Sequence, residues 1–171
     1  MRTICWIFVC LLMAAIPSWA GEWKDTTIRL LPDESFAVVE TDAHGNKIRH
    51  CPYRDANGRI DEEQLIRALG RLDAETWLRP SHATKARRVL ERHYQRCHAR
   101  IMKSNLPLVV DLNDASLQQL VRLPGIGPVL AVRIVDYRDH RASFTTPEDI
   151  MKVEGISRNT FLAIRHYIRT D

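Results

Sequence analysis

Residues 123–131 read LPGIGPVLA and place Gly125 and Gly127 on either side of one isoleucine. The segments before and after this stretch have the apolar spacing of helices, so the stretch predicts a short turn between two helices. Such a turn needs a residue in the left-handed conformation, which glycine adopts without steric cost. The apolar Ile126 between the glycines is expected to point inward and to anchor the turn in the core.

The same pattern returns at an offset of 30 residues. Leu120, Leu123, Gly125, Ile126, Ala131, Ile134 and Tyr137 correspond to Ile150, Val153, Gly155, Ile156, Phe161, Ile164 and Tyr167. Each half also begins with a residue pair spaced as in a capping box, Ser116 with Gln119 and Thr146 with Asp149. Pro147 stands at a first helical position, where proline is favoured. Residues 107–171 are therefore predicted to form a domain that contains two copies of a helix, a tight turn and a second helix.

The sharp turns suggest a binding chemistry. The first N–H groups of a helix have no partner within that helix, and the positive end of the helix dipole lies beside them. These groups form a natural site for phosphate. A glycine at position 127 would also let a phosphate approach the backbone closely.

Residues 109–168 closely resemble the tandem helix-hairpin-helix domain of the ComEA family of competence DNA receptors. The resemblance is carried by DLN-x-AS, LPGIG, YR, PED and V-x-GI. It implies a four-helix domain that binds duplex DNA without sequence preference, in the periplasm or on the outer face of the membrane. Family members often have a basic or polar residue after the first hairpin, where this chain has Pro128-Val129-Leu130. Ser157 replaces the usual second glycine of the second hairpin.

The resemblance and the turn chemistry together nominate a set of DNA-binding residues. The set comprises Arg122, Gly125, Ile126, Gly127, Lys152, Gly155, Ser157, Arg158, Asn159 and Thr160. The alternative is that the same module serves as a structural or protein-docking unit that does not bind DNA. An enzyme is not expected, because the sequence has no G-x-S-x-G or H-E-x-x-H motif and no Lys/Asp pair after the hairpin like that of a glycosylase. No cofactor or metal is expected.

Charge is distributed unevenly along the chain. Residues 107–171 carry 8 basic and 8 acidic residues, and residues 21–80 carry 9 basic and 12 acidic ones. Residues 81–106 carry 7 basic residues and 1 acidic residue. A hairpin domain with no net charge is poorly suited to nonspecific DNA binding, which is mainly electrostatic. The basic segment just upstream could offset this deficit.

That basic segment reads as one amphipathic helix. Its apolar stripe consists of Ala86, Val89, Leu90, Tyr94, Cys97 and Ile101. Its basic stripe consists of Lys85, Arg88, Arg92, Arg96, Arg100 and Lys103. Such a stripe could neutralise phosphates along a nucleic acid, although a solvated helix face has the same pattern, and anionic lipid is a third candidate partner.

Residues 21–106 predict a small α+β accessory domain, so the whole chain is expected to be mostly α (α+β). FAVVETD and KIRHC flank the turn AHGN as in a short hairpin, and Asp61 precedes an amphipathic helix as its N-cap. Residues 35–100 resemble a small domain attached to phage head-maturation proteases, through SFAVVE, HCPYRDANGRID, ALGRL and LERHY. This resemblance implies a compact accessory unit and no chemistry.

The first 20 residues predict a signal peptide. Arg2 precedes an apolar run from Ile4 to Ile16, and Ser18-Trp19-Ala20 places small residues at the two cleavage-determining positions before Gly21. The run is shorter than a membrane-spanning helix requires. We therefore expect a periplasmic or secreted protein without stable membrane insertion. Proteins of an uptake or envelope assembly are candidate partners. The alternative is a membrane anchor formed by the uncleaved segment.

Cleavage at this site would remove Cys5 and Cys10 and leave Cys51 and Cys97. Two cysteines in an exported chain predict one disulfide between them. A zinc site is the alternative, because His93 and Cys97 lie four residues apart and would share a helix face.

Overall fold

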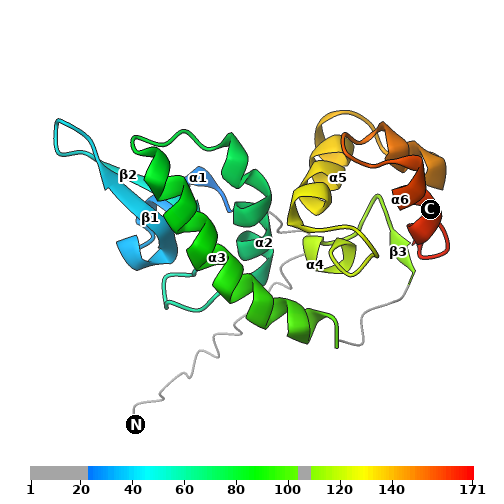
Figure 1. Ribbon diagram of the computed structural model, residues 1–171, viewed down its shortest axis with the longest axis horizontal. Coiled ribbons are helices and arrows are strands. Elements are labelled where there is room, and N and C mark those ends of the chain that lie inside the picture. Colours follow the sequence, from blue (N-terminus) through cyan, green and yellow to red (C-terminus); the bar gives the residue numbers. More distant parts are fainter. Residues whose placement is uncertain (1–22, 104–108) are drawn as a thin grey trace, which may run out of the picture.

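The computed structural model describes residues 23–103 and 109–171 (Figure 1). The predicted signal peptide, with Ala20 and Gly21 at its cleavage site, lies outside the described residues. Helices dominate and the sheets are small, as expected for a mostly α (α+β) chain. None of the described helices is both long enough and apolar enough to cross a membrane.

The first half begins with α1 (Asp25–Leu30) and η1 (Asp33–Ser35), which lead into the predicted hairpin. Strands β1 (Phe36–Thr41) and β2 (Lys47–Pro52) pair antiparallel, with Val38 opposite His50. The hairpin turn contains Gly45 at φ 83°, a left-handed conformation. The sequence-based prediction of a hairpin around AHGN is therefore confirmed.

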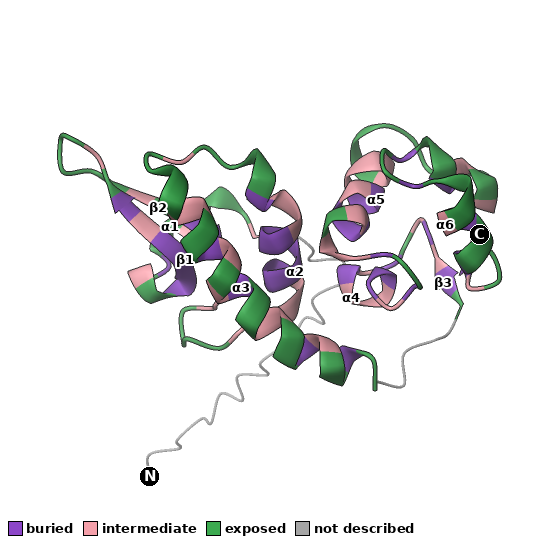
Figure 2. Ribbon diagram, viewed as in Figure 1, coloured by how far each residue is buried: buried purple, intermediate pink, exposed green. Residues whose placement is uncertain are grey.

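Helix α2 (Glu62–Arg71) begins as predicted, because the Asp61 carboxylate accepts a hydrogen bond from the Gln64 N–H at 3.0 Å. After η2 (Leu72–Ala74) comes the long helix α3 (Pro80–Ile101). Ala86, Leu90, Cys97 and Ile101 of its predicted apolar stripe are buried. The outward face of α3 is exposed, whereas α2 is buried along most of its length (Figure 2).

A buried carboxylate joins the start of α3 to the hairpin. The Glu40 side chain is 2% exposed and accepts hydrogen bonds from the N–H groups of Leu78 and Arg79, at 2.9 and 3.0 Å. Its oxygens also lie 2.9 Å from His50 Nε2 and 2.8 Å from His82 Nδ1. Burial alone would raise the pKa of Glu40, but these donors lower it below its usual value.

The second half contains the two predicted hairpins. The first consists of α4 (Leu117–Leu120) and α5 (Pro128–His140), and the second of η3 (Pro147–Lys152) and α6 (Arg158–Ile164). The first helix of each pair is therefore only a short α or 3₁₀ segment. Strands β3 (Val110–Asp111) and β4 (Ile168–Arg169), which the sequence did not predict, pair in parallel and join the two ends of this half.

The predicted capping boxes lie at the starts of α4 and η3. At α4, the Ser116 hydroxyl accepts from the Gln119 N–H, and the Gln119 side chain accepts from the Ser116 N–H. At η3, the Asp149 carboxylate accepts from the N–H groups of Thr145 and Thr146. Both helix starts therefore have backbone donors satisfied by side chains.

Helix α2 packs directly against the hairpin half, mainly against α5. A Cβ atom on Gly70 would lie 2.5 Å from Val132 Cγ2 and 2.7 Å from the Pro128 carbonyl oxygen. The Glu63 carboxylate accepts from the Leu117 N–H at the start of α4, and Arg71 pairs with Asp136 of α5 at 2.8 Å. The buried side chains of both halves form one continuous cluster.

Cys51 and Cys97, which we expect to form a disulfide in the exported chain, are both free thiols in the structure. Both are buried, Cys51 in β2 and Cys97 on α3. Burial, followed by the nearby Glu75 carboxylate, raises the pKa of the Cys51 thiol to about 12. Burial also raises the pKa of Cys97. Both thiols are therefore held in the uncharged, unreactive form.

Replacing Gly70 with alanine tests the contact between the two halves. We expect Gly70→Ala to lower the free energy of unfolding by about 1–3 kcal/mol, because the added methyl group overpacks α2 against α5. Gly127→Ala is the matched control, since a Cβ there meets nothing within 4 Å and φ is −91°. Chemical denaturation would measure both, and a Gly70→Ala protein as stable as the wild type would contradict the close packing.

The Glu40 cluster predicts that the stability of the fold depends on pH. Because the pKa of Glu40 is lower in the folded chain than its ordinary value of 4.5, the carboxylate stabilises the fold above about pH 4.5. This contribution is lost as the pH falls through the lowered value. Glu40→Gln should therefore be less stable at pH 7 and should lose less stability between pH 7 and about pH 3.

Thermal unfolding followed by circular dichroism across this pH range measures the effect. The exposed Glu148→Gln serves as the control, because it removes a carboxylate without disturbing the cluster. Identical pH profiles for Glu40→Gln and the wild type would show that the carboxylate does not stabilise the start of α3.

Candidate nucleic-acid interface

The two predicted turns have the same backbone structure. Gly125 has φ 77° and Gly155 has φ 91°, both in the left-handed region. The next residue of each turn donates its N–H to the carbonyl three residues earlier, from Ile126 to Leu123 at 3.0 Å and from Ile156 to Val153 at 3.1 Å. Both isoleucine side chains are buried. Glycine is therefore needed at the first turn position for its conformation, and isoleucine anchors each turn as predicted.

The turns also lie against one another's helices. A Cβ on Gly125 would be 4.0 Å from Thr160 Cγ2 of α6, and one on Gly155 would be 3.0 Å from Leu130 Cδ2 of α5. Thr160 and Leu130 are equivalent positions of the repeat. The second half therefore has an approximate two-fold arrangement, in which the two turns are neighbours.

Four N–H groups of these turns have no backbone acceptor among the described residues. They belong to Gly125 and Gly127 in the first turn and to Gly155 and Ser157 in the second. Gly125, Gly155 and Ser157 are exposed, and Gly127 is half-buried. These donors can hydrogen-bond to an oxygen-rich anion such as phosphate without breaking an existing backbone bond.

Gly127 differs from the two left-handed glycines. It has φ −91° and ψ −178°, an extended conformation that any residue adopts. A Cβ on it would meet nothing within 4 Å. Neither backbone strain nor packing requires glycine at this position, and a side chain there would point into open space.

In the second turn, the polar side chains are partly engaged with one another. The Ser157 hydroxyl accepts from the Thr160 N–H at 3.1 Å and lies 3.0 Å from the Thr160 hydroxyl. It thereby caps the start of α6. Arg158 and Asn159 are exposed and have no hydrogen-bond or ion-pair partner in the described part of the chain. They are the side chains of this turn most readily available to a ligand.

The nominated lysine already has a partner. Lys152 Nζ lies 2.7 Å from the Asp149 carboxylate. The hydrogen bond and charge of Lys152, with the N–H groups of Thr146 and Thr145, lower the pKa of Asp149 to about 2. The lysine is therefore charged at neutral pH and paired with this carboxylate. Arg122 is half-buried just before the first turn.

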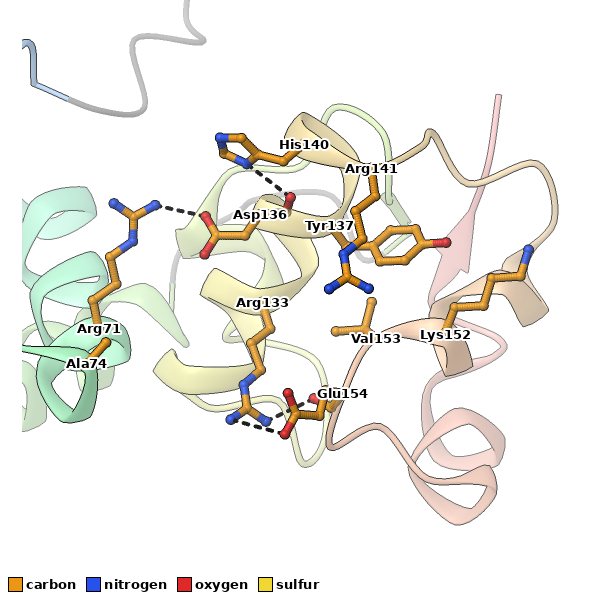
Figure 3. A pocket seen from close by; sticks show the side chains of 10 residues that line it. All are labelled: Arg71, Ala74, Arg133, Asp136, Tyr137, His140, Arg141, Lys152, Val153 and Glu154. Carbon is orange, nitrogen blue, oxygen red and sulfur yellow. Dashed lines mark hydrogen bonds and ion pairs between the residues drawn. The ribbon is translucent and has the colours of Figure 1, made fainter.

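Sequence reasoning missed Arg133 of α5, which joins the two hairpins. Its Nη1 donates to the Glu154 carbonyl oxygen at 3.0 Å, and its Nη2 lies 4.0 Å from the Glu154 carboxylate (Figure 3). Glu154 directly precedes the left-handed Gly155, so this contact positions the second turn. The repeat gave no signal for this role, because the residue equivalent to Arg133 in the second half is Ala163.

Other residues of the recognised motifs stabilise the domain. The Asn113 side chain accepts from the Phe144 N–H at 2.8 Å and donates to the Phe144 carbonyl at 3.0 Å. Arg138 Nη1 donates to the Ala115 carbonyl at 2.6 Å. The DLN and YR stretches therefore hold the start of the domain against the linker between hairpins and against α5.

The basic stripe of α3 is exposed throughout, with Lys85, Arg88, Arg92, Arg96, Arg100 and Lys103 all at the surface. Arg100 pairs with Glu62, whereas the other five have no ion pair among the described residues. The pKa of nearby His93 is lowered by burial and then by the charges of Arg54, Arg96 and Arg92. Helix α2 lies between α3 and the hairpins, so the stripe and the turns are separate regions.

The zinc alternative finds no support in this geometry. Among the described residues, no group of three or more histidine, cysteine or acidic side chains is placed to hold a metal ion. His93 instead lies beside the Tyr53 ring, with the ring centres 5.3 Å apart.

Comparison with known proteins agrees with the geometry of the second half. Residues 108–169 match the family described as the helix-hairpin-helix motif. ComE operon protein 1 of Bacillus subtilis is 40% identical over 60 residues, which make up 35% of this chain and 29% of that protein. Endonuclease/exonuclease/phosphatase family domain-containing protein 1 of Rattus norvegicus is 35% identical over 69 residues, or 39% of this chain and 12% of that protein.

The chain therefore spans less than a third of the length of these relatives. The family match, at residues 108–169, covers the two hairpins and the strands that join their ends. Residues 108–169 of this chain are a ComEA-like helix-hairpin-helix domain.

Proposed function

We propose that this chain is an exported protein that binds duplex DNA without sequence preference, with the two hairpin turns holding backbone phosphates. The single observation that carries the proposal is the pair of equivalent, neighbouring turns with four N–H groups that lack backbone acceptors among the described residues. Backbone amides contact phosphates and do not read bases, which is the basis of binding without sequence preference. Arg158 and Asn159 add side-chain donors to the second turn.

Binding to DNA requires more positive charge than the hairpin half supplies. The hairpin half has no net charge, and Lys152 is already paired with Asp149. Nonspecific affinity for DNA comes mainly from the release of counterions by basic side chains. The exposed basic stripe of α3 supplies such side chains on the same chain, and two linked weak sites bind a long ligand more tightly than either alone.

The cellular role that we propose is DNA capture or uptake outside the cytoplasm. The predicted signal peptide would export the chain, and the hairpin domain is similar to that of ComE operon protein 1. The two-domain division, with an accessory unit at 21–106 and the hairpin domain at 107–171, is part of this proposal. In it, the accessory unit carries the basic stripe and is joined to the hairpins through α2.

A gel shift with random-sequence duplex DNA tests the proposal with the mature chain. If about four phosphates are contacted, affinity should fall by about 100-fold between 50 and 200 mM salt. Gly127→Val should weaken binding because it places a side chain beside the turn N–H groups, and Arg158→Ala should remove a reinforcing charge. Together they should weaken binding by at least about tenfold while the fold survives.

The controls separate folding from binding. Position 127 has open space and an extended backbone, so circular dichroism of the double variant should match the wild type. Gly127→Ala, with a smaller side chain, should have an intermediate effect. Unchanged affinity in a folded Gly127→Val/Arg158→Ala protein would overturn the hairpin role, and no shift by the wild type at 50 mM salt would favour the docking-module alternative.

The contribution of the basic stripe is tested separately. Replacing Arg88, Arg92 and Arg96 with glutamine should weaken duplex binding and make the salt dependence shallower by about 0.9 for each lost phosphate contact. All three side chains are exposed and have no ion pair among the described residues, so stability should be unaffected. A salt dependence identical to that of the wild type would show that the stripe is only a solvated helix face.

A further inference from the structure

A hollow of about 550 Å³ lies where the two halves of the chain meet (Figure 3). Arg71 and Ala74 line it from the end of α2 and from η2, and the side of α5 forms another wall. The third wall is Lys152-Val153-Glu154, which leads directly into the second turn. Its size lies in the range of pockets that hold small organic ligands.

The lining has more basic than acidic residues. Arg71, Arg133 and Arg141 lie beside Asp136 and Glu154, and Lys152, which also lines the hollow, is paired with Asp149 outside the lining. Both acidic groups already have arginine partners, Asp136 with Arg71 at 2.8 Å and Glu154 with Arg133 at 4.0 Å. The hollow therefore favours an anion.

Arg141 is the cation of the hollow without a partner among the described residues. It follows α5 as its C-cap residue and is exposed. Figure 3 shows its guanidinium directed into the hollow, toward Val153, while the Lys152 ammonium points away. A planar guanidinium donates two parallel hydrogen bonds to phosphate oxygens.

The hollow also offers an apolar wall. Tyr137 lines it and stacks on Phe144, with the ring centres 5.1 Å apart, so its ring is held in a fixed orientation. Val153, just before the second turn, also lines it. A charged donor beside a rigid aromatic ring matches a ligand that combines a phosphate with a flat base.

We infer that this hollow binds a nucleotide phosphate, with Arg141 as its main donor. The phosphate has two candidate sources. The first is a DNA strand that continues from the second turn, and for this source the inference rests on the proposed function. The other source is a free nucleotide, which would bind without DNA. In both cases the recognised chemistry is a phosphate ester beside a base.

The experiment compares two exposed C-cap arginines in the full mature chain. Arg141→Gln removes the donor in the hollow. Arg165→Gln removes a charge at the matching C-cap position of α6, which does not line the hollow. Fluorescence anisotropy measures binding of a 30-base-pair duplex, and amide chemical shifts are followed during titration with deoxyadenosine monophosphate. Circular dichroism checks that both variants are folded.

If the phosphate belongs to DNA, Arg141→Gln should weaken duplex binding about threefold to tenfold and make the salt dependence shallower by about 0.9, while Arg165→Gln has a smaller effect. If it belongs to a free nucleotide, the monophosphate should shift the amides of Tyr137, Arg141 and Val153 in the wild type but not in Arg141→Gln. Either result supports the inference.

The inference is overturned if the two variants bind duplex equally well and the monophosphate shifts none of these amides. That result leaves the proposed function intact when the wild type still binds duplex and the Gly127→Val/Arg158→Ala protein does not. Conversely, a wild type that binds no duplex removes the proposed function, and the nucleotide titration still decides what the hollow does.

Discussion

The close contact of α2 with α5 is the constraint on which the arrangement of this chain depends. Gly70 allows the two helices to approach so closely that even a methyl group would overlap Val132 and the Pro128 carbonyl. Around this point, Glu63 caps α4 and Arg71 pairs with Asp136. Helix α2 thus belongs to the packing of both halves. The basic helix, the hairpin turns and the hollow between the halves all take their relative positions from it.

The Glu63 contact shows that this junction is polar as well as apolar. Burial raises the pKa of Glu63, and the Leu117 N–H that it accepts acts in the opposite direction. A carboxylate from one half therefore accepts a hydrogen bond from a backbone N–H at a helix start in the other half. Without this carboxylate, the N–H would need a water molecule as its acceptor. Separating the halves would expose apolar surface and also leave the Leu117 N–H without its acceptor, although the Ser116 capping box would remain.

The glycines and arginines of the hairpin domain fall into two groups, those that the fold requires and those that remain candidates for binding. Gly125 and Gly155 are required by the left-handed backbone, whereas a Cβ on Gly127 would meet nothing within 4 Å and the Gly127 N–H has no backbone acceptor among the described residues. Arg133 and Arg138 donate to backbone carbonyls and hold the hairpins in place. Arg158 has no partner among the described residues. Residues of the same type thus differ in role because their surroundings differ, and this difference separates candidate phosphate ligands from supports.

Local patterns in the sequence determined the elements of this protein. The repeated turn, the inward isoleucines, the Asp61 and Ser116 caps and the amphipathic α3 all depend on neighbouring residues, which share one turn or one helix face. The tertiary structure alone decided the contacts between distant residues: the β3–β4 pair, the Gly70 approach and the Arg133 bridge. It also placed Cys51 and Cys97 as free thiols in the buried core, and the bond that the sequence predicts between them stays a prediction. Spacing along a chain reports which side chains share a face, but it does not report which faces meet, because that depends on how whole elements pack.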